Sequence, residues 1–83
     1  MKRLFFQEAY NQALKSEMNF NHGAVLIYRG KIIGRGYNTY YNTNSNKKRS
    51  LHAEVSAILD GLKKIKVEDL KRCELVIIRV NSQ

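Results

Sequence analysis

Hydrophobic residues recur along the first half of the chain with two different periods. Between residues 3 and 18 they fall at helical spacing, in a row of Phe5, Ala9 and Ala13 beside a row of Phe6, Tyr10 and Leu14. Residues 23–29 and 31–37 are short runs rich in branched apolar residues, and a glycine turn joins them. We therefore expect a helix whose aromatic residues face the core, a turn over 19–23, and a β-hairpin.

The second half of the chain shows the same succession of patterns. Residues 38–50 are polar, asparagine-rich and aperiodic, which predicts a loop that is either functional or simply solvated. After Ser50, a suitable N-cap, helical spacing returns, and apolar residues over 73–80 predict a strand buried on both faces. The helical positions are Val55, Ile58, Leu59, Leu62 and Ile65.

The resulting order, α-β-β-α-β, predicts a single α/β domain with no internal boundary. A helix between two strands implies a crossover, so we expect the last strand to lie parallel to an earlier one in a helix-flanked mixed sheet. Gly34 and Gly36 interrupt the second strand, which predicts a bulge or the close approach of another backbone.

Composition narrows the classes of protein that need to be considered. The 83 residues are 43% hydrophobic and 27% charged, as in globular proteins, and Cys73 is the only cysteine, so an internal disulfide or a thiolate cluster is excluded. With no apolar run long enough to span a bilayer, we expect a soluble, intracellular and most simply cytoplasmic chain, with no membrane partner. The formal net charge of +8 favours phosphate-bearing partners, nucleotides or nucleic acid, but it also suits a solvated basic domain.

One triplet carries candidate chemistry, His52-Ala53-Glu54 at the start of the second helix. Because the first residue is only half within the helix, both side chains can border one pocket, where an imidazole can bind zinc and a carboxylate can move protons. The competing interpretation is an exposed first turn whose acidic group suits the helix dipole.

The triplet gains weight from its surroundings. The segment HGAVLIYRGKIIGRGYN followed by LHAEVSAI resembles the N-terminal half of the zinc-dependent cytidine and deoxycytidylate deaminase superfamily, which includes tRNA adenosine deaminases. The resemblance covers essentially the whole chain. It implies a cytidine deaminase-like three-layer fold, with residues 1–83 forming part of a CMP/dCMP-type deaminase domain, a hydrolase of nucleotide metabolism.

The resemblance also implies roles for individual residues. His52 would be a Zn²⁺ ligand, and Glu54 the general acid and base that serves a zinc-bound water attacking C4 of cytosine, or C6 of adenine. Asn38 would contact the sugar of a cytosine-type nucleoside or nucleotide, and the Ala53 N–H the base. Both residues also have a purely structural explanation. Asparagine is common in the turn that ends a strand, and a crowded pocket floor would require a residue as small as Ala53.

The chain departs from the family pattern at the metal site. The family completes its site with P-C-x-x-C after the strand that follows the helix, and this sequence has neither the proline nor a cysteine pair. Cys73 precedes that strand, and His22 has no place in the family pattern. We expect an incomplete zinc site, substoichiometric zinc and an inactive chain, a fragment or remnant that a C-terminal segment could complete.

Two alternatives from other functional classes remain open at this point. The chain could be a non-catalytic module that binds nucleic acid or a partner chain through its basic loop, Lys47, Lys48 and Arg49, and the apolar edge of its last strand. That edge also predicts homo-oligomers. Alternatively, the triplet is coincidental in a generic α/β domain.

Overall fold

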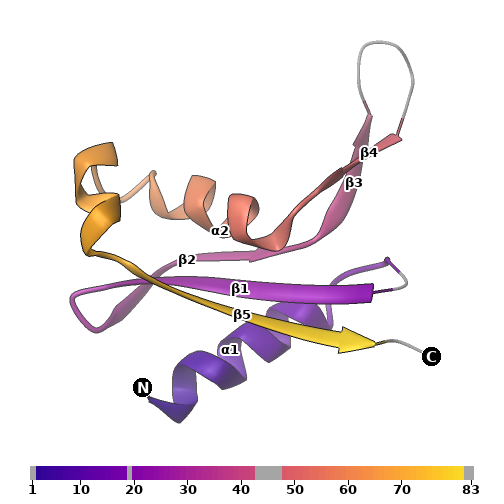
Figure 1. Ribbon diagram of the computed structural model, residues 1–83, viewed down its shortest axis with the longest axis horizontal. Helices are drawn as coiled ribbons and strands as arrows, with labels where there is room; N and C mark the ends of the chain where they lie inside the picture. The colour runs from indigo at the N-terminus through magenta and orange to yellow at the C-terminus, as the bar shows by residue number, and fades with distance from the viewer. Residues whose placement is uncertain (1, 19, 43–47, 82–83) are drawn as a thin grey trace.

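The computed structural model describes residues 2–18, 20–42 and 48–81. Its order of elements extends the predicted one by a second hairpin and a short 3-10 helix (Figure 1). The elements are α1 (Arg3–Ala13), β1 (Phe20–Tyr28), β2 (Lys31–Tyr37), β3 (Thr39–Asn42), β4 (Lys48–Leu51), α2 (Ala53–Gly61), η1 (Val67–Arg72) and β5 (Glu74–Asn81).

Three strands form the sheet at the centre, in the order β2-β1-β5, and the two helices lie on opposite faces of it (Figure 1). Strand β1 pairs antiparallel with both neighbours. Strand β5 therefore runs in the same direction as β2, as the crossover through α2 predicts, but β1 separates the two. This arrangement of helix, sheet and helix confirms the predicted α/β class and its layers.

The alternation of β1 builds a core on each face of the sheet. Val25 and Ile27 face α1 and pack with Phe5 in one buried cluster. Ala24 faces α2 and packs in a second buried cluster with Ala53 and Ala57 of that helix. A central strand covered on both sides has to be apolar throughout, which explains the continuous run that predicted it.

Strand β2 contains both features that its glycines predicted. The pairing with β1 shifts between Leu26, which lies opposite Gly34, and Ile27, which lies opposite Ile32, so Ile33 is an extra residue at a β-bulge. Beyond the bulge, a Cβ atom at Gly36 would overlap the backbone of α2 at Ala57. The missing side chain therefore lets the start of α2 lie directly on the sheet.

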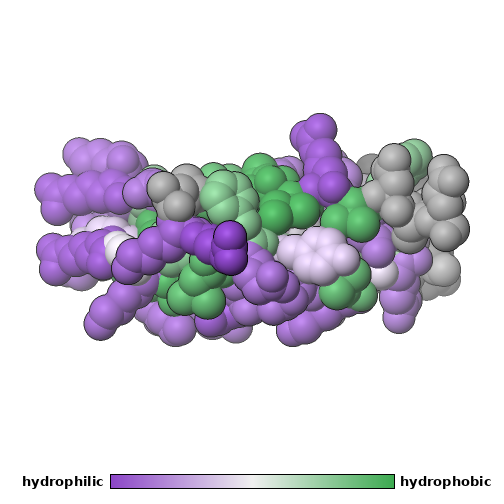
Figure 2. Space-filling model, turned by 90° about the horizontal axis from the view of Figure 1, so that it is seen from below, coloured by the Kyte–Doolittle hydropathy of each residue, from purple (hydrophilic) through white to green (hydrophobic). Residues whose placement is uncertain are grey.

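Both helices are shorter than the hydrophobic pattern predicted, and one face of each is exposed. The row of Phe5, Ala9 and Ala13 is buried, whereas Phe6, Tyr10 and Leu14 are 42–56% exposed, so the prediction of a core-facing second row is wrong. Hydrophobic side chains accordingly appear among hydrophilic ones on the surface that faces the viewer in Figure 2. Helix α2 ends at Gly61, before the predicted position Ile65.

Two predictions about irregular segments are also wrong. Residues 20–23, predicted as a turn, are the first residues of β1, because they pair with the end of β5. The predicted loop over 38–50 contains an antiparallel hairpin, β3 with β4, that projects from the sheet (Figure 1). Lys47 and the side chains of Lys48 and Arg49, the predicted basic loop, lie outside what the structure describes.

Strand β5 is buried on one face only, which corrects the prediction for residues 73–80. Val76 faces α1 and is buried, whereas Leu75 and Ile77 face the α2 side and are 38% and 39% exposed. Helix α2 lies over β2 and β1 and leaves this part of β5 uncovered. The predicted apolar edge strand is therefore present at the border of the described sheet.

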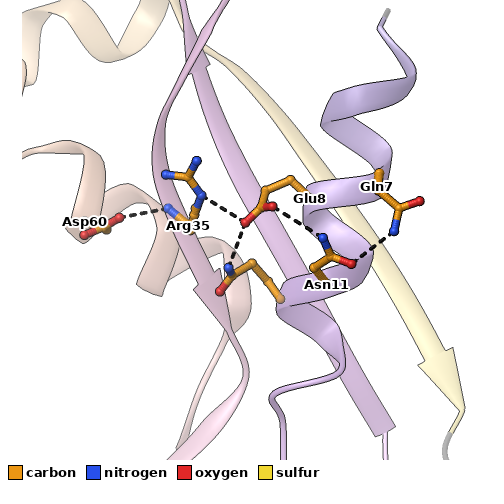
Figure 3. A network of polar contacts seen from close by, with 6 residues as sticks. Gln7, Glu8, Asn11, Arg35 and Asp60 are labelled. Carbon is orange, nitrogen blue, oxygen red and sulfur yellow. Dashed lines mark hydrogen bonds and ion pairs between the residues drawn. The ribbon is translucent and has the colours of Figure 1, made fainter.

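A polar network joins the two helices around the outer edge of β2 (Figure 3). The Glu8 carboxylate of α1 accepts a hydrogen bond from the Arg35 guanidinium at 2.9 Å and from the Gln12 amide at 3.1 Å. The Arg35 backbone N–H donates to the Asp60 carboxylate of α2 at 2.9 Å.

In the described part of the chain, neither helix is long and apolar enough to cross a membrane.

Candidate active site

His52 occupies the N-cap position of α2. Its backbone is extended, with φ −70° and ψ 147°, and its carbonyl accepts the Ser56 N–H at 3.0 Å, the first bond of the helix. The predicted N-cap, Ser50, lies instead in β4 opposite Tyr40. Because His52 is at the boundary, its imidazole lies outside the helix and is 68% exposed.

Glu54 lies beside His52 in the first turn of the helix. Its Oε1 atom is 3.8 Å from Nδ1 of His52, which is too long for a hydrogen bond. The carboxylate also benefits from the positive end of the helix dipole. The two side chains therefore adjoin one another, with the carboxylate 35% exposed.

A hollow of about 280 Å³ opens between the start of β1, the end of β2 and the β3–β4 hairpin. The structure brings His52 and Asn38 together in its wall, whereas Glu54 lies beside His52 and outside the lining. The side chains that define this hollow, called the His52 hollow below, include those of Phe20, His22, Asn38, Tyr40, Leu51 and His52.

Asn38 is buried, and its amide connects to the backbone of β1. Its Oδ1 accepts the His22 N–H at 2.8 Å, and its Nδ2 donates to the Phe20 carbonyl at 2.6 Å. These bonds fix the amide at the place where the chain leaves β2. An amide has two donor hydrogens and two acceptor lone pairs, so one of each remains for a second partner.

Ala53, the residue between His52 and Glu54, is fully buried against Ala24 and Ala57. A larger side chain would push the start of α2 away from the sheet, so crowding accounts for its size. As the first residue of the helix, Ala53 has an N–H with no carbonyl one turn earlier to accept it.

His22 also lines the His52 hollow, a position that the sequence alone did not predict. Even-numbered residues of β1 face α2, so His22 shares a face with Ala24 and reaches the His52 hollow. The alternation of β1 could have revealed this position, but the expected turn over residues 19–23 removed His22 from the strand.

The ligand set for a metal is incomplete in the described part of the chain. No group of three or more His, Cys, Asp or Glu side chains there could hold a metal ion, whereas a catalytic zinc takes about three protein ligands. Cys73 lies at the far end of the sheet, where its thiol donates to the Asp69 carbonyl. Burial, and secondly the Asp69 charge, raise the pKa of that thiol and disfavour the thiolate that zinc requires.

Comparison with known protein families identifies a match over almost the whole chain. A family described as the cytidine and deoxycytidylate deaminase zinc-binding region matches residues 1–80. A comparison with curated proteins gives no match. The matched residues include β1, β2, all of β5 except Asn81, and every residue that lines the His52 hollow.

Proposed function

Because the chain belongs to the cytidine and deoxycytidylate deaminase family, we propose that the His52 hollow receives the base of a cytosine-type nucleoside or nucleotide. The domain would contribute to hydrolytic deamination, in which oxygen from water replaces the amino group at C4 and ammonia leaves. The observation that carries this proposal is the convergence of Asn38 and His52 on one hollow, with the Glu54 carboxylate 3.8 Å from the imidazole.

The residues in the wall of the hollow and beside it have distinct proposed roles. The Glu54 carboxylate would take the two protons of the attacking water in turn, passing the first to the ring nitrogen of the base and the second to the departing nitrogen. The remaining donor and acceptor of the Asn38 amide would bind the sugar, because the β1 backbone already fixes the orientation of that amide. The Ala53 N–H would donate to an acceptor on the base.

The described residues do not make a complete zinc site, and we propose that the zinc of this family requires further ligands. His52 would supply one ligand, and a segment carrying two thiolates the others. Strand β5 offers such a segment a place to dock, since Leu75 and Ile77 are exposed beside its outer edge. The chain alone would then hold less than one zinc ion per molecule and catalyse little.

Metal analysis with and without a complementing peptide tests this proposal. We expect substoichiometric zinc for the purified chain, rising toward one ion per chain when a peptide with a Pro-Cys-x-x-Cys sequence is added. His52→Ala should prevent the rise. In the complemented protein, Glu54→Gln should keep the zinc but lower the rate of dCMP or cytidine deamination by roughly 10²-fold or more.

The two substitutions make the outcomes distinguishable. Zinc uptake by His52→Ala equal to that of the unchanged chain would remove His52 from the metal site. Deamination by Glu54→Gln at the original rate would contradict the proposed proton transfer. Both variants change exposed or half-exposed side chains, so loss of folding is not expected to obscure either result.

A further inference from the structure

A second hollow, of about 740 Å³, lies at the opposite end of β1 from the His52 hollow. The turn after β1, the end of α2 and η1 surround it, and Figure 2 shows hydrophilic side chains projecting at the end of the molecule where these elements lie (left). Five cationic side chains line this basic groove: Arg29, Lys63, Lys64, Lys66 and Arg72.

Structural roles explain only some of these five cationic residues. Lysines that follow the end of α2 stabilise the helix by interacting with the negative end of its dipole. The Lys63 ammonium also lies 3.7 Å from the Asp60 carboxylate. Within the part of the chain that the structure describes, Lys64, Lys66 and Arg72 form no ion pair. The lining also contains two carboxylates, those of Glu68 and Asp69, but the five cations outnumber them, so the net charge of the groove is positive. Like charges gathered in a concave surface focus a positive potential, which attracts anions.

The turn after β1 supplies an independent observation. Arg29 has a φ of +51°, in the left-handed region where glycine, asparagine and aspartate are the usual residues. Its guanidinium lies over the Tyr28 ring, 5.1 Å from the centroid. A stacked guanidinium keeps its N–H groups in the plane available to phosphate oxygens. The cation is therefore held in place at the wall of the groove before any ligand binds.

We infer that the basic groove binds the sugar-phosphate backbone of a nucleic-acid strand. Five cations spread over three elements exceed what one phosphate can contact, and they suit successive phosphates along a strand. A concave surface fits such a strand better than it fits a flat bilayer. The inference does not depend on the proposed deaminase function, because the groove and the His52 hollow share no residue.

Fluorescence anisotropy with a labelled single strand of about 20 nucleotides, measured over a range of salt concentrations, tests the inference. The groove variant carries Lys64→Gln, Lys66→Gln and Arg72→Gln. A matched control removes three exposed cations from the region of α1 by Lys2→Gln, Arg3→Gln and Lys15→Gln. Both variants lose the same formal charge, so the comparison separates the groove from the general charge of the protein.

We expect the groove variant to bind about tenfold more weakly at moderate salt, with the slope of log K against log salt reduced by roughly 2. The control should stay within about twofold of the unchanged chain. Equal weakening in both variants would overturn the inference. So would binding to phosphatidylserine vesicles that depends on the groove while the oligonucleotide does not bind.

Arg29→Gly provides a second variant that keeps the turn, since glycine accepts the positive φ without strain. It removes one guanidinium from the wall, so the salt slope should fall by about 0.7. Circular dichroism should be unchanged. An unchanged salt slope in a folded Arg29→Gly protein would exclude Arg29 from the contact.

Discussion

Glu8 shows how one side chain can join three elements of this small protein. Its carboxylate accepts hydrogen bonds from Gln12 in α1 and from Arg35 in β2, and Arg35 is in turn bonded to α2. The hydrogen bond from Gln12, followed by the Arg35 guanidinium, holds the pKa of Glu8 below its ordinary value of 4.5, although partial burial opposes this. The network therefore depends on an ionised carboxylate.

This depressed pKa predicts a pH dependence of stability. Because the carboxylate is favoured in the folded state, Glu8 stabilises the protein fully above its unfolded pKa, near 4.5, and this contribution is lost as the pH falls through the lower folded pKa. The difference in free energy of unfolding between the unchanged chain and Glu8→Gln should be constant above about pH 5.5 and shrink below about 4.5. Urea unfolding at several pH values measures it.

Gln7→Ala is the matched control for this experiment. It removes the hydrogen bond from Gln7 to Asn11, at 3.0 Å, and leaves both principal partners of Glu8 in place. Its pH profile should follow that of the unchanged chain. A Glu8→Gln profile parallel to the original down to pH 3 would show that the carboxylate contributes nothing specific.

Among the elements, the contact of β2 with α2 decides where the candidate active site lies. The helix lies so close to the strand that a Cβ at Gly36 would overlap Ala57, Ser56 and the carbonyl of Ala53. The N-cap His52 directly precedes these residues. The position of the imidazole therefore depends on a glycine in another element.

Gly36→Ala should consequently destabilise the fold and displace the start of α2. We expect a loss of about 3 kcal/mol in the free energy of unfolding, since backbone atoms must move to relieve the overlap. The control is Gly30→Ala, where the added Cβ meets open space and the cost comes from its φ of +77° alone, about 1 kcal/mol. Equal denaturation midpoints for the two variants would contradict the steric argument.

The sequence correctly predicted the elements whose apolar or glycine pattern results directly from burial. Val25 and Ile27 lie in a strand covered on both faces, and Gly34 and Gly36 mark the bulge and close approach that their type predicts. The family resemblance also followed from the sequence, and the family match confirms it.

Other features could not be predicted because they depend on distant partners. The hairpin of β3 and β4 has no apolar alternation, and Ser50 belongs to it through pairing with Tyr40 rather than through any local signal. Leu75 and Ile77 belong to an apolar run that resembles a buried strand. They are exposed because α2 lies over β1 and β2, which the sequence of β5 does not encode.

The described sheet ends at β5 in an edge that neither a helix nor another described strand covers. Strand β5 pairs with β1 on one side, and its other side has no neighbour in the part of the chain that the structure describes. Leu75 and Ile77 add exposed apolar surface beside this edge. Unpaired backbone groups next to apolar side chains favour pairing with another strand.

We therefore expect concentration-dependent self-association that Ile77→Lys reduces, because a charged side chain on an edge strand opposes pairing. Sedimentation equilibrium at several concentrations measures it. Leu59→Lys adds the same charge at an apolar side chain of α2 that is 55% exposed and should leave association unchanged. If both variants dissociate equally, or the unchanged chain is monomeric at all concentrations, the edge does not mediate contacts between copies.

The bulge at Ile33 adds one residue to the α2 side of the hairpin. Because β2 contains one residue more than β1 across this point, Ile33 and Gly34 both face α2, and Gly36 follows on the same side. Without Ile33, Ile32 and Gly34 would follow one another opposite Ile27 and Leu26, and the rest of β2 would keep its faces, because residues that lie opposite each other in a sheet share a face. The surplus residue thus leaves the orientation of its neighbours unchanged and adds one apolar side chain on the α2 side, beside Gly61.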